Sequence, residues 1–174
     1  MTKIQLDQVV RVLSRTPQTV NALLGDLCDE WAVSSGDEAK WAPFDVVGHL
    51  IHGEETDWIP RAEIILAQGE NCTFVPFDRV AQFGSSTDKT LDDLLVEFDR
   101  LRAENLEKLS AWNLSDNELA LKGMHPELGE VTLSQLLATW AVHDLNHVDQ
   151  LTRALAQRHA GDVGPWTQYL SILQ

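Results

Sequence analysis

The chain has 174 residues, 27 of them acidic and 13 basic, with a formal net charge of −14 at pH 7. This length fits one globular domain over residues 1–174, and an acidic surface without a basic patch disfavours nucleic acid and anionic membranes as partners. No apolar run is long enough for a signal peptide or a membrane span, so we expect a cytoplasmic protein.

Apolar residues recur with helical spacing over residues 5–28. Because proline is poorly tolerated inside a helix, Pro17 predicts a break near Thr16. A second helix is expected over residues 43–68, with a proline in its first turn and Gly69 as its stop.

Residues 69–88 are aromatic but aperiodic, which predicts a long ordered loop after the second helix, lying over one end of a helical bundle. Thr90 and Asp93 have the spacing of a capping box and open a third long helix, whose apolar stripe runs to Leu109.

Residues 112–131 are irregular in pattern, and a second capping box at Thr132 and Gln135 opens a fourth long helix that continues to about His159. A short amphipathic tail then offers apolar side chains for docking against the bundle: Val163, Trp166, Leu170 and Ile172. With no strand pattern, the sequence predicts an all-α four-helix bundle with a short C-terminal helix.

The two cysteines, Cys28 and Cys72, have no CxxC neighbour. We expect buried free thiols, with a reactive cysteine as the alternative. No GxSxG, HExxH, Walker or dinucleotide glycine pattern is present, so the corresponding hydrolases, zincins and nucleotide sites have no support.

His143 and His147 are one helical turn apart and follow the inward face of the fourth helix, so their nitrogens can converge on one divalent ion. A third ligand must come from another helix, and the second helix offers His49 and His52. Three imidazoles plus an open position is the arrangement of catalytic zinc sites. The alternative is that these histidines are hydrogen-bonded structural residues.

Carboxylates lie close to the histidines in the sequence. Glu54 and Glu55 follow His52 on the second helix, and Asp144 adjoins His143. They are candidates for holding imidazole tautomers or for a general base, and a solvated surface position is the alternative that we favour for at least one glutamate.

Three segments resemble the DinB-like (DinB/YfiT) superfamily: WAPFDVVGHLIHGEETDW from residue 41, TLSQLLATWAVHDLNHVDQLTRAL from residue 132, and VGPWTQYLSIL from residue 163. The similarity spans nearly the whole chain and includes a frame of tryptophans. The resemblance implies a four-helix bundle with a divalent metal, zinc or nickel before other ions, held by His49, His143 and His147. His52 then becomes a bystander or supports a ligand. The tryptophans are Trp41, Trp58, Trp140 and Trp166.

The family includes enzymes that use low-molecular-weight thiols for S-transfer or isomerisation, and others described as metal-dependent hydrolases. The resemblance therefore implies that the metal activates a small thiol for transfer to an electrophilic small molecule. The loop of Phe74, Phe77, Asp78 and Arg79 is a candidate cover for the pocket, with Arg79 available for a substrate carboxylate. Aromatic packing and a surface ion pair are the alternative for this loop.

Two other functions stay open at the level of the sequence. One is hydrolysis by a water molecule that the metal activates, with Glu54 or Glu55 relaying protons. The other is a metal- or ligand-binding stress protein without turnover, acting as a homodimer.

Overall fold

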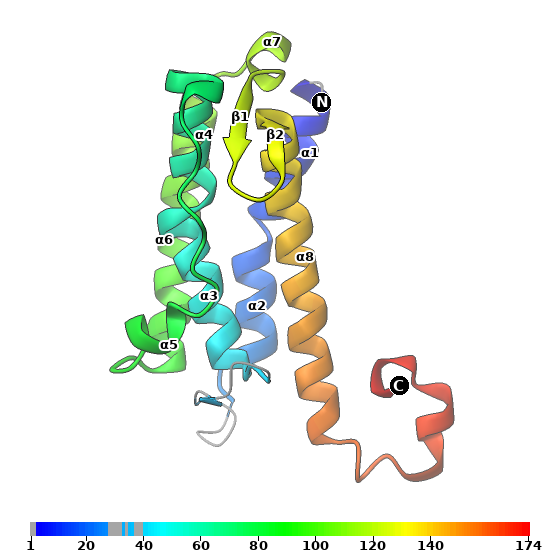
Figure 1. The fold of residues 1–174 in the computed structure, drawn as a ribbon. Helices are drawn as coiled ribbons and strands as arrows, with labels where there is room; N and C mark the ends of the chain where they lie inside the picture. The colour runs from blue at the N-terminus through cyan, green and yellow to red at the C-terminus, as the bar shows by residue number, and fades with distance from the viewer. Residues whose placement is uncertain (1–2, 28–32, 34, 37–39) are drawn as a thin grey trace.

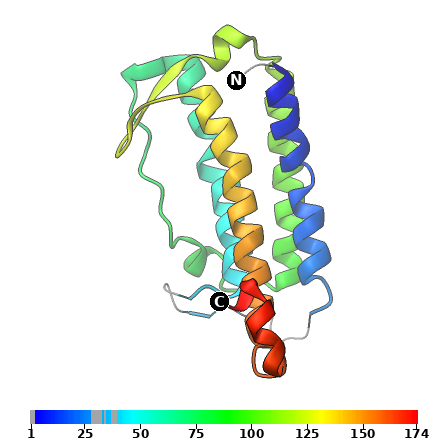
Figure 2. The same ribbon diagram turned by 90° about the vertical axis from the view of Figure 1, so that its right-hand side faces the viewer.

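The computed structural model describes residues 3–27, 33, 35, 36 and 40–174, with only the backbone of residues 3 and 4. Within this part of the chain, long helices line up as a four-helix bundle (Figures 1 and 2), so the predicted all-α fold is confirmed. Its four members are α1 (Lys3–Leu13) with α2 (Thr16–Leu24), α3 (Pro43–Thr56) with α4 (Trp58–Gln68), α6 (Leu91–Ala111), and α8 (Leu133–Arg158).

The long connection after α4 sets the topology of the bundle. It includes η1 (Gly69–Asn71), which contacts strand β1 (Lys122–His125) at one end of the bundle, and α5 (Gln82–Ser85), which contacts α3 at the other. The expected position over one end of the bundle was therefore wrong. The segment runs along the side of the bundle, so α6 starts beside the first turns of α3 and runs in the same direction as α3 and α4 (Figure 1).

The second predicted helix is divided in two at Asp57, a break that was not predicted. Asp57 separates α3 from α4 with φ −110° and ψ −72°. Pro60 in the first turn of α4 explains the break, because its ring would clash with the carbonyl of Thr56 and it has no N–H to donate. The break near Thr16 is confirmed, and α4 ends at Gln68 as predicted, with Gly69 at φ +59°.

Both predicted capping boxes are confirmed. The Thr90 hydroxyl accepts from the Asp93 N–H (3.1 Å), and the Asp93 carboxylate accepts from the Thr90 N–H (2.9 Å). Thr132 and Gln135 make the same reciprocal pair at 3.2 and 2.8 Å. These bonds satisfy backbone donors that have no partner inside α6 or α8.

A β-hairpin stands where the sequence predicted irregular structure without strands, so that part of the prediction was wrong. After α7 (Asp116–Leu119), β1 pairs antiparallel with β2 (Gly129–Thr132), and an isolated bridge joins Thr73 to Met124. Each strand has four residues, too few for an alternating pattern to be recognised. At Gly123 a Cβ atom would meet Ile65 and Phe74 at 2.7 and 2.9 Å, so glycine lets the hairpin approach α4 closely.

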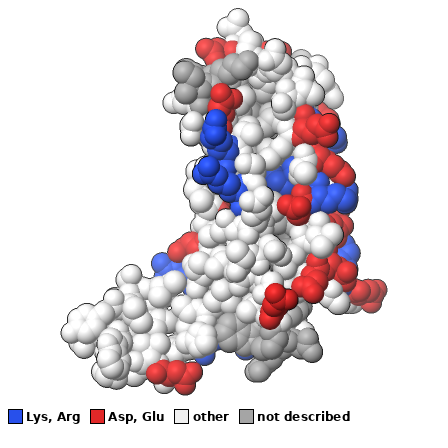
Figure 3. Space-filling model, turned by 180° about the vertical axis from the view of Figure 1, so that it is seen from behind, with Lys and Arg blue, Asp and Glu red and all other residues white. Residues whose placement is uncertain are grey.

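The C-terminal tail contacts the bundle through η3 (Ser171–Leu173), which meets α8, and it does not bury its apolar side chains there as predicted. It forms η2 (Gly164–Tyr169) and η3 (Ser171–Leu173), which contain no buried residue, and Trp166 is 67% exposed. The tail projects from the end of α8 (Figure 1), and in Figure 3 it is a largely uncharged protrusion. The homodimer stays a prediction. None of the helices in the described ranges is long and apolar enough to cross a bilayer.

The centre of the bundle holds a buried polar network around Arg102 of α6. Its guanidinium donates to Glu54 of α3 (2.7 and 3.0 Å), to Asp144 of α8 (2.6 and 3.1 Å) and to the backbone carbonyl of Leu13 in α1 (2.8 Å). Asn105 also donates to Glu54, at 2.8 and 2.9 Å. One cation therefore joins all four members of the bundle, and burial would lower its pKa, but Glu54 and Asp144 outweigh burial and raise it.

Replacing Arg102 should be costly because it leaves two carboxylates buried without their cation. We expect Arg102→Leu to lower the free energy of unfolding by about 3–5 kcal/mol. The matched control is Arg100→Leu, whose partner Glu104 is 53% exposed, and which should cost less than about 1 kcal/mol. Urea denaturation of both variants tests this, and equal losses would contradict it.

Candidate metal centre

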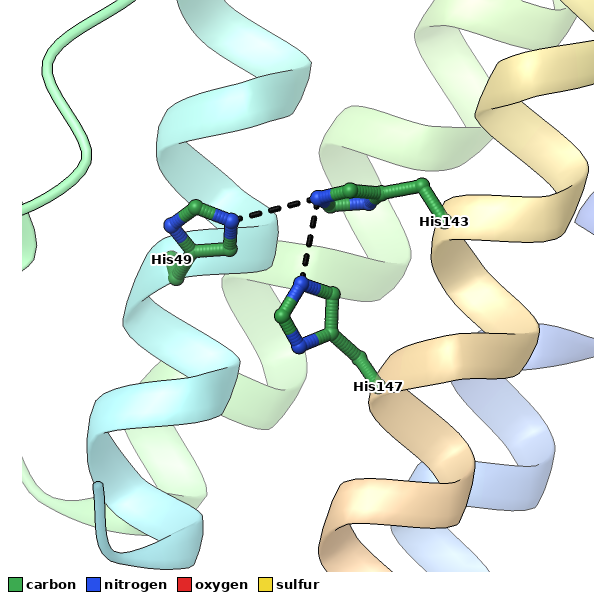
Figure 4. A group of neighbouring side chains, drawn as sticks. All are labelled: His49, His143 and His147. Carbon is green, nitrogen blue, oxygen red and sulfur yellow. Dashed lines mark hydrogen bonds between the residues drawn. The ribbon is translucent and has the colours of Figure 1, made fainter. Parts of the chain in front are cut away.

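Three imidazoles from two helices meet inside the bundle. His49 comes from α3, and His143 and His147 come from successive turns of α8 (Figure 4). The Nε2 atom of His143 lies 3.2 Å from that of His49 and 3.1 Å from that of His147. Among the described residues, these are the side chains whose ligand atoms gather closely enough to hold an ion, all within 4.8 Å of one another.

Hydrogen bonds alone do not satisfy this arrangement. Gln150 Oε1 lies 2.8 Å from His147 Nδ1, and because an amide oxygen can only accept, the proton of neutral His147 is on Nδ1 and its Nε2 carries a lone pair. His143 Nε2 has two nitrogen neighbours but can donate only one proton. The Nδ1 atoms of His49 and His143 are buried without a partner. The chemistry of the cluster therefore fits a cation.

The distances agree with that interpretation. An ion about 2.1 Å from each nitrogen in tetrahedral geometry would hold the nitrogens about 3.4 Å apart. The observed separations of 3.2 and 3.1 Å are close to this value. The three histidines fit a divalent metal, and among the described residues they are the group whose atoms could hold it, which leaves a fourth position of a tetrahedral site without a ligand from this part of the chain.

Burial keeps the three imidazoles neutral. Desolvation, followed by the nearby His147, lowers the pKa of both His49 and His143 to about 3. Desolvation also lowers the pKa of His147, against opposing effects of the Gln150 hydrogen bond and Asp144. A neutral imidazole is the form that binds metals, so burial prepares these ligands at physiological pH.

The histidines line one wall of a cavity of about 510 Å³. Its other walls come from the break between α3 and α4, the 74–79 segment, the hairpin and the first half of α8. Trp58 stands edge-on to His143 (5.1 Å between ring centroids), and Trp41 lies 4.8 Å from His49. Trp140 stacks on Trp58 behind the wall, whereas Trp166 is far out on the tail. The cavity gives a small molecule access to the metal position.

The predicted pocket loop contributes three of its residues to the cavity. Phe74, Phe77 and Arg79 line it, and the Phe77 ring stands edge-on to His49 at 5.4 Å. Asp78 is exposed, and its carboxylate accepts from the Val80 N–H at 3.0 Å. His52 lies outside the histidine cluster, with its ring 4.9 Å from Phe77.

The carboxylates near the histidines bond elsewhere. Glu54 accepts from Arg102 and Asn105, and from the Trp140 indole N–H at 3.1 Å, while Asp144 is bonded to Arg102. Glu55 is exposed. Glu54 and Asp144 therefore hold the helices that carry the histidines without bonding to the imidazoles.

Two other groups near the site escaped the sequence analysis. Gln150 lies one turn after His147, a spacing that could have identified it as a tautomer-fixing residue. Asp57, Arg61 and His125 line the same cavity, and only the tertiary structure brings the hairpin to α4. Cys72 is half-buried and free, and Cys28 lies outside the described residues.

The sequence matches the family profile described as the DinB superfamily over residues 13–151, which begins at the last residue of α1 and includes α2, the site and most of α8. This chain belongs to the DinB superfamily. A comparison with the curated proteins gives no significant match.

Among solved structures, the chain is similar to YfiT from Bacillus subtilis, described as a probable metal-dependent hydrolase with an unusual four-helix bundle topology. The TM-score is 0.75, the sequence identity is 20%, and the match covers 91% of this chain and 90% of YfiT. At this identity the likeness supports the bundle fold of this DinB-family chain.

Removing one imidazole should remove the metal. We expect purified His143→Ala to lose the stoichiometric divalent ion of the unaltered protein while its far-ultraviolet circular dichroism stays helical. His52→Ala is the matched control and should keep the ion, because His52 lies outside the cluster. Elemental analysis of both variants beside the parent measures this, and unchanged metal in His143→Ala would refute the site.

Gln150 should tune affinity without supplying a ligand. Gln150→Leu removes the acceptor of the His147 Nδ1–H, so metal affinity should fall about 10–100-fold with unchanged stoichiometry at saturation. Asn146→Leu, at an exposed position of α8, is the control. Competition with a chelator gives the dissociation constants, and equal affinity for both variants would exclude this role.

The metal-free protein should lose stability as the pH falls below about 6.5. His49 and His143 titrate near 3 when folded and near 6.5 when unfolded, so the unfolded chain binds protons that the folded chain rejects. This loss of folding stability is absent well above pH 6.5 and grows as the pH falls toward 3. Urea midpoints of chelator-treated protein at pH 7.5 and 5.5 should show the drop, and His143→Gln should show a smaller one. Equal drops would contradict the assignment.

Proposed function

We propose that this DinB-family protein is a metal-dependent enzyme that activates a low-molecular-weight thiol for transfer to an electrophilic small molecule. The observation that supports it best is the convergence of three neutral imidazole nitrogens on the wall of a cavity. Three protein ligands with an open fourth position are typical of catalytic sites, whereas structural sites are closed. Zinc and nickel are the metals that we propose first, since both suit imidazole ligands.

A bound divalent ion would lower the pKa of a thiol, so that the reactive thiolate forms at neutral pH. The protein then needs to orient the two reactants and exclude water. The Trp41, Trp58 and Phe77 rings around the histidines provide a largely apolar surface for this. In the transfer, a sulfur–carbon bond forms, the leaving group departs with its bonding electrons, and the thiol proton passes to solvent.

The positions of the carboxylates favour a thiol over water as the nucleophile. Hydrolysis needs a group that moves protons during the reaction. Glu54, the buried candidate, is occupied by Arg102, Asn105 and Trp140, and Glu55 is exposed. A thiol that loses its proton on binding makes less demand on such a group.

Metal-dependent hydrolysis is the second candidate, and one residue favours it. Asp57 is buried in the cavity wall, where desolvation raises its pKa despite the nearby Arg61. A raised pKa makes a carboxylate a stronger proton acceptor, which is the property that a general base needs. The description of YfiT as a probable metal-dependent hydrolase agrees with this alternative.

Thiol dependence separates the proposals. The metal-loaded protein should consume 1-chloro-2,4-dinitrobenzene only when a small thiol is supplied, and should not hydrolyse 4-nitrophenyl acetate faster than His143→Ala does. Thiol-independent ester hydrolysis that Asp57→Asn abolishes would favour the hydrolase. If neither reaction depends on His143 and the fourth metal position proves to be filled by the protein, the chain is a metal-binding protein without turnover.

A further inference from the structure

A second polar cluster lies in the same cavity, at the end formed by α4 and the hairpin. It consists of Asp57, Arg61 and His125, and the remaining wall there is largely apolar, with Phe74, Pro126 and Val131 among its residues. None of these three polar residues belongs to the histidine cluster of the candidate metal centre. Polar groups placed on an apolar wall usually fix the orientation of a ligand.

Arg61 is a buried cation that is only partly satisfied by the protein. The residue is 8% exposed, its Nε lies 2.5 Å from the Asp57 carboxylate, and its Nη2 donates to the Val75 carbonyl at 3.2 Å. Its Nη1 amino group has no acceptor among the described residues. Nη1 is not one of the fully buried atoms that lack a partner, and Arg61 lines the cavity, so the free edge of this guanidinium is available to an acceptor there.

His125 presents a second donor on the wall of the same cavity, where burial lowers the pKa of its imidazole and the nearby charge of Arg61 lowers it further. Its Nδ1 accepts from the backbone N–H groups of Glu127 (3.1 Å) and Leu128 (3.2 Å), so the ring proton is on Nε2. The Phe74 ring links the two residues in space. The Arg61 guanidinium carbon lies 5.3 Å from the centre of that ring, and the His125 ring meets it edge-on at 6.3 Å.

The surrounding structure holds the two donors in place. Asp57 and the Val75 carbonyl fix the guanidinium from one side, and the hairpin that carries His125 is attached to the 73–74 segment by the Thr73–Met124 bridge and by the Phe74 N–H donating to the Met124 carbonyl (2.9 Å). A guanidinium edge with a neighbouring N–H matches the planar oxygens of a carboxylate.

We propose that Arg61 and His125 form a carboxylate-binding subsite, which holds the anionic end of a small reactant while its reacting end lies at the histidine cluster. This inference rests on the proposed function for the role of the reactant. Asp57 orients the guanidinium and balances part of its positive charge. Because the remaining charge is small, the match between the planar guanidinium and a planar carboxylate contributes to binding as well as the charge does. The carboxylate belongs either to the thiol or to the electrophile.

Binding to metal-free protein tests the subsite separately from the metal. Ligand-observed NMR should give benzoate an affinity at least about tenfold higher than that of benzamide, which has the same shape without the charge. Arg61→Met should abolish this preference, and Arg61→Lys should restore it only in part, since an ammonium lacks the planar fork. Equal binding of the two probes, or binding of neither, would overturn the proposal.

Two further variants control for folding and for the second cavity cation. Arg79→Met removes the exposed guanidinium at the cavity and should keep the benzoate preference. His125→Asn keeps an acceptor for the Glu127 and Leu128 N–H groups but removes the Nε2–H, and should reduce the preference even if Arg61→Met does not fold. A preference lost in Arg79→Met and kept in Arg61→Met or His125→Asn would overturn the assignment.

The metal-loaded protein then identifies the reactant that carries the carboxylate. S-alkylation rates are compared for 3-mercaptopropionate against 2-mercaptoethanol, and for iodoacetate against iodoacetamide, in the parent and in Arg61→Met. A faster reaction of the carboxylate reactant that depends on Arg61, in either pair, supports the subsite and identifies the reactant that it binds. If neither pair shows such a difference, the subsite has no role in the reaction.

Metal content is measured in parallel. A parent protein that has its full metal content but does not prefer benzoate refutes only this inference, whereas absence of metal from the parent refutes the proposed function.

Discussion

The contact on which the rest of this structure depends is the buried guanidinium of Arg102. It contacts the Leu13 carbonyl in α1, Glu54 in α3 and Asp144 in α8, so a single side chain of α6 connects every member of the bundle. Its charge is balanced by two carboxylates that are themselves fully buried. Such a network contributes little net stability compared with apolar packing, but it is costly to break, and it favours one arrangement of the helices.

This arrangement also positions the metal centre. Asp144 directly follows His143, and Glu54 lies five residues after His49 on α3. When the two carboxylates turn toward Arg102, the histidines of α3 and α8 face each other across the neighbouring side of the interface, next to the cavity. Residues that are neighbours in the sequence therefore serve two different places: the carboxylates bond to Arg102 in the bundle core, and the histidines form the site. This explains why two acidic residues close to the histidines in the sequence do not bond to them.

The cavity owes its shape to the segments outside the long helices. The 69–90 connection passes along the bundle and contributes Phe77 and Arg79, while the hairpin before α8 contributes His125. One end of the cavity then offers three neutral imidazoles and the other an oriented guanidinium. In a chain with a formal net charge of −14, a cation in an enclosed position can attract an anionic ligand that the surface as a whole repels.

The sequence by itself determined the four long members of the bundle, the capping boxes at Thr90 and Thr132, and the pairing of His143 with His147, because these depend on contacts three or four residues apart. The choice between His49 and His52 came from the family resemblance, and the structure places only His49 in the cluster. The partners of Arg102, the hairpin, and the meeting of Arg61 with His125 were decided by tertiary structure. They join residues 42 to 89 positions apart, or strands of four residues, for which local periodicity carries no signal.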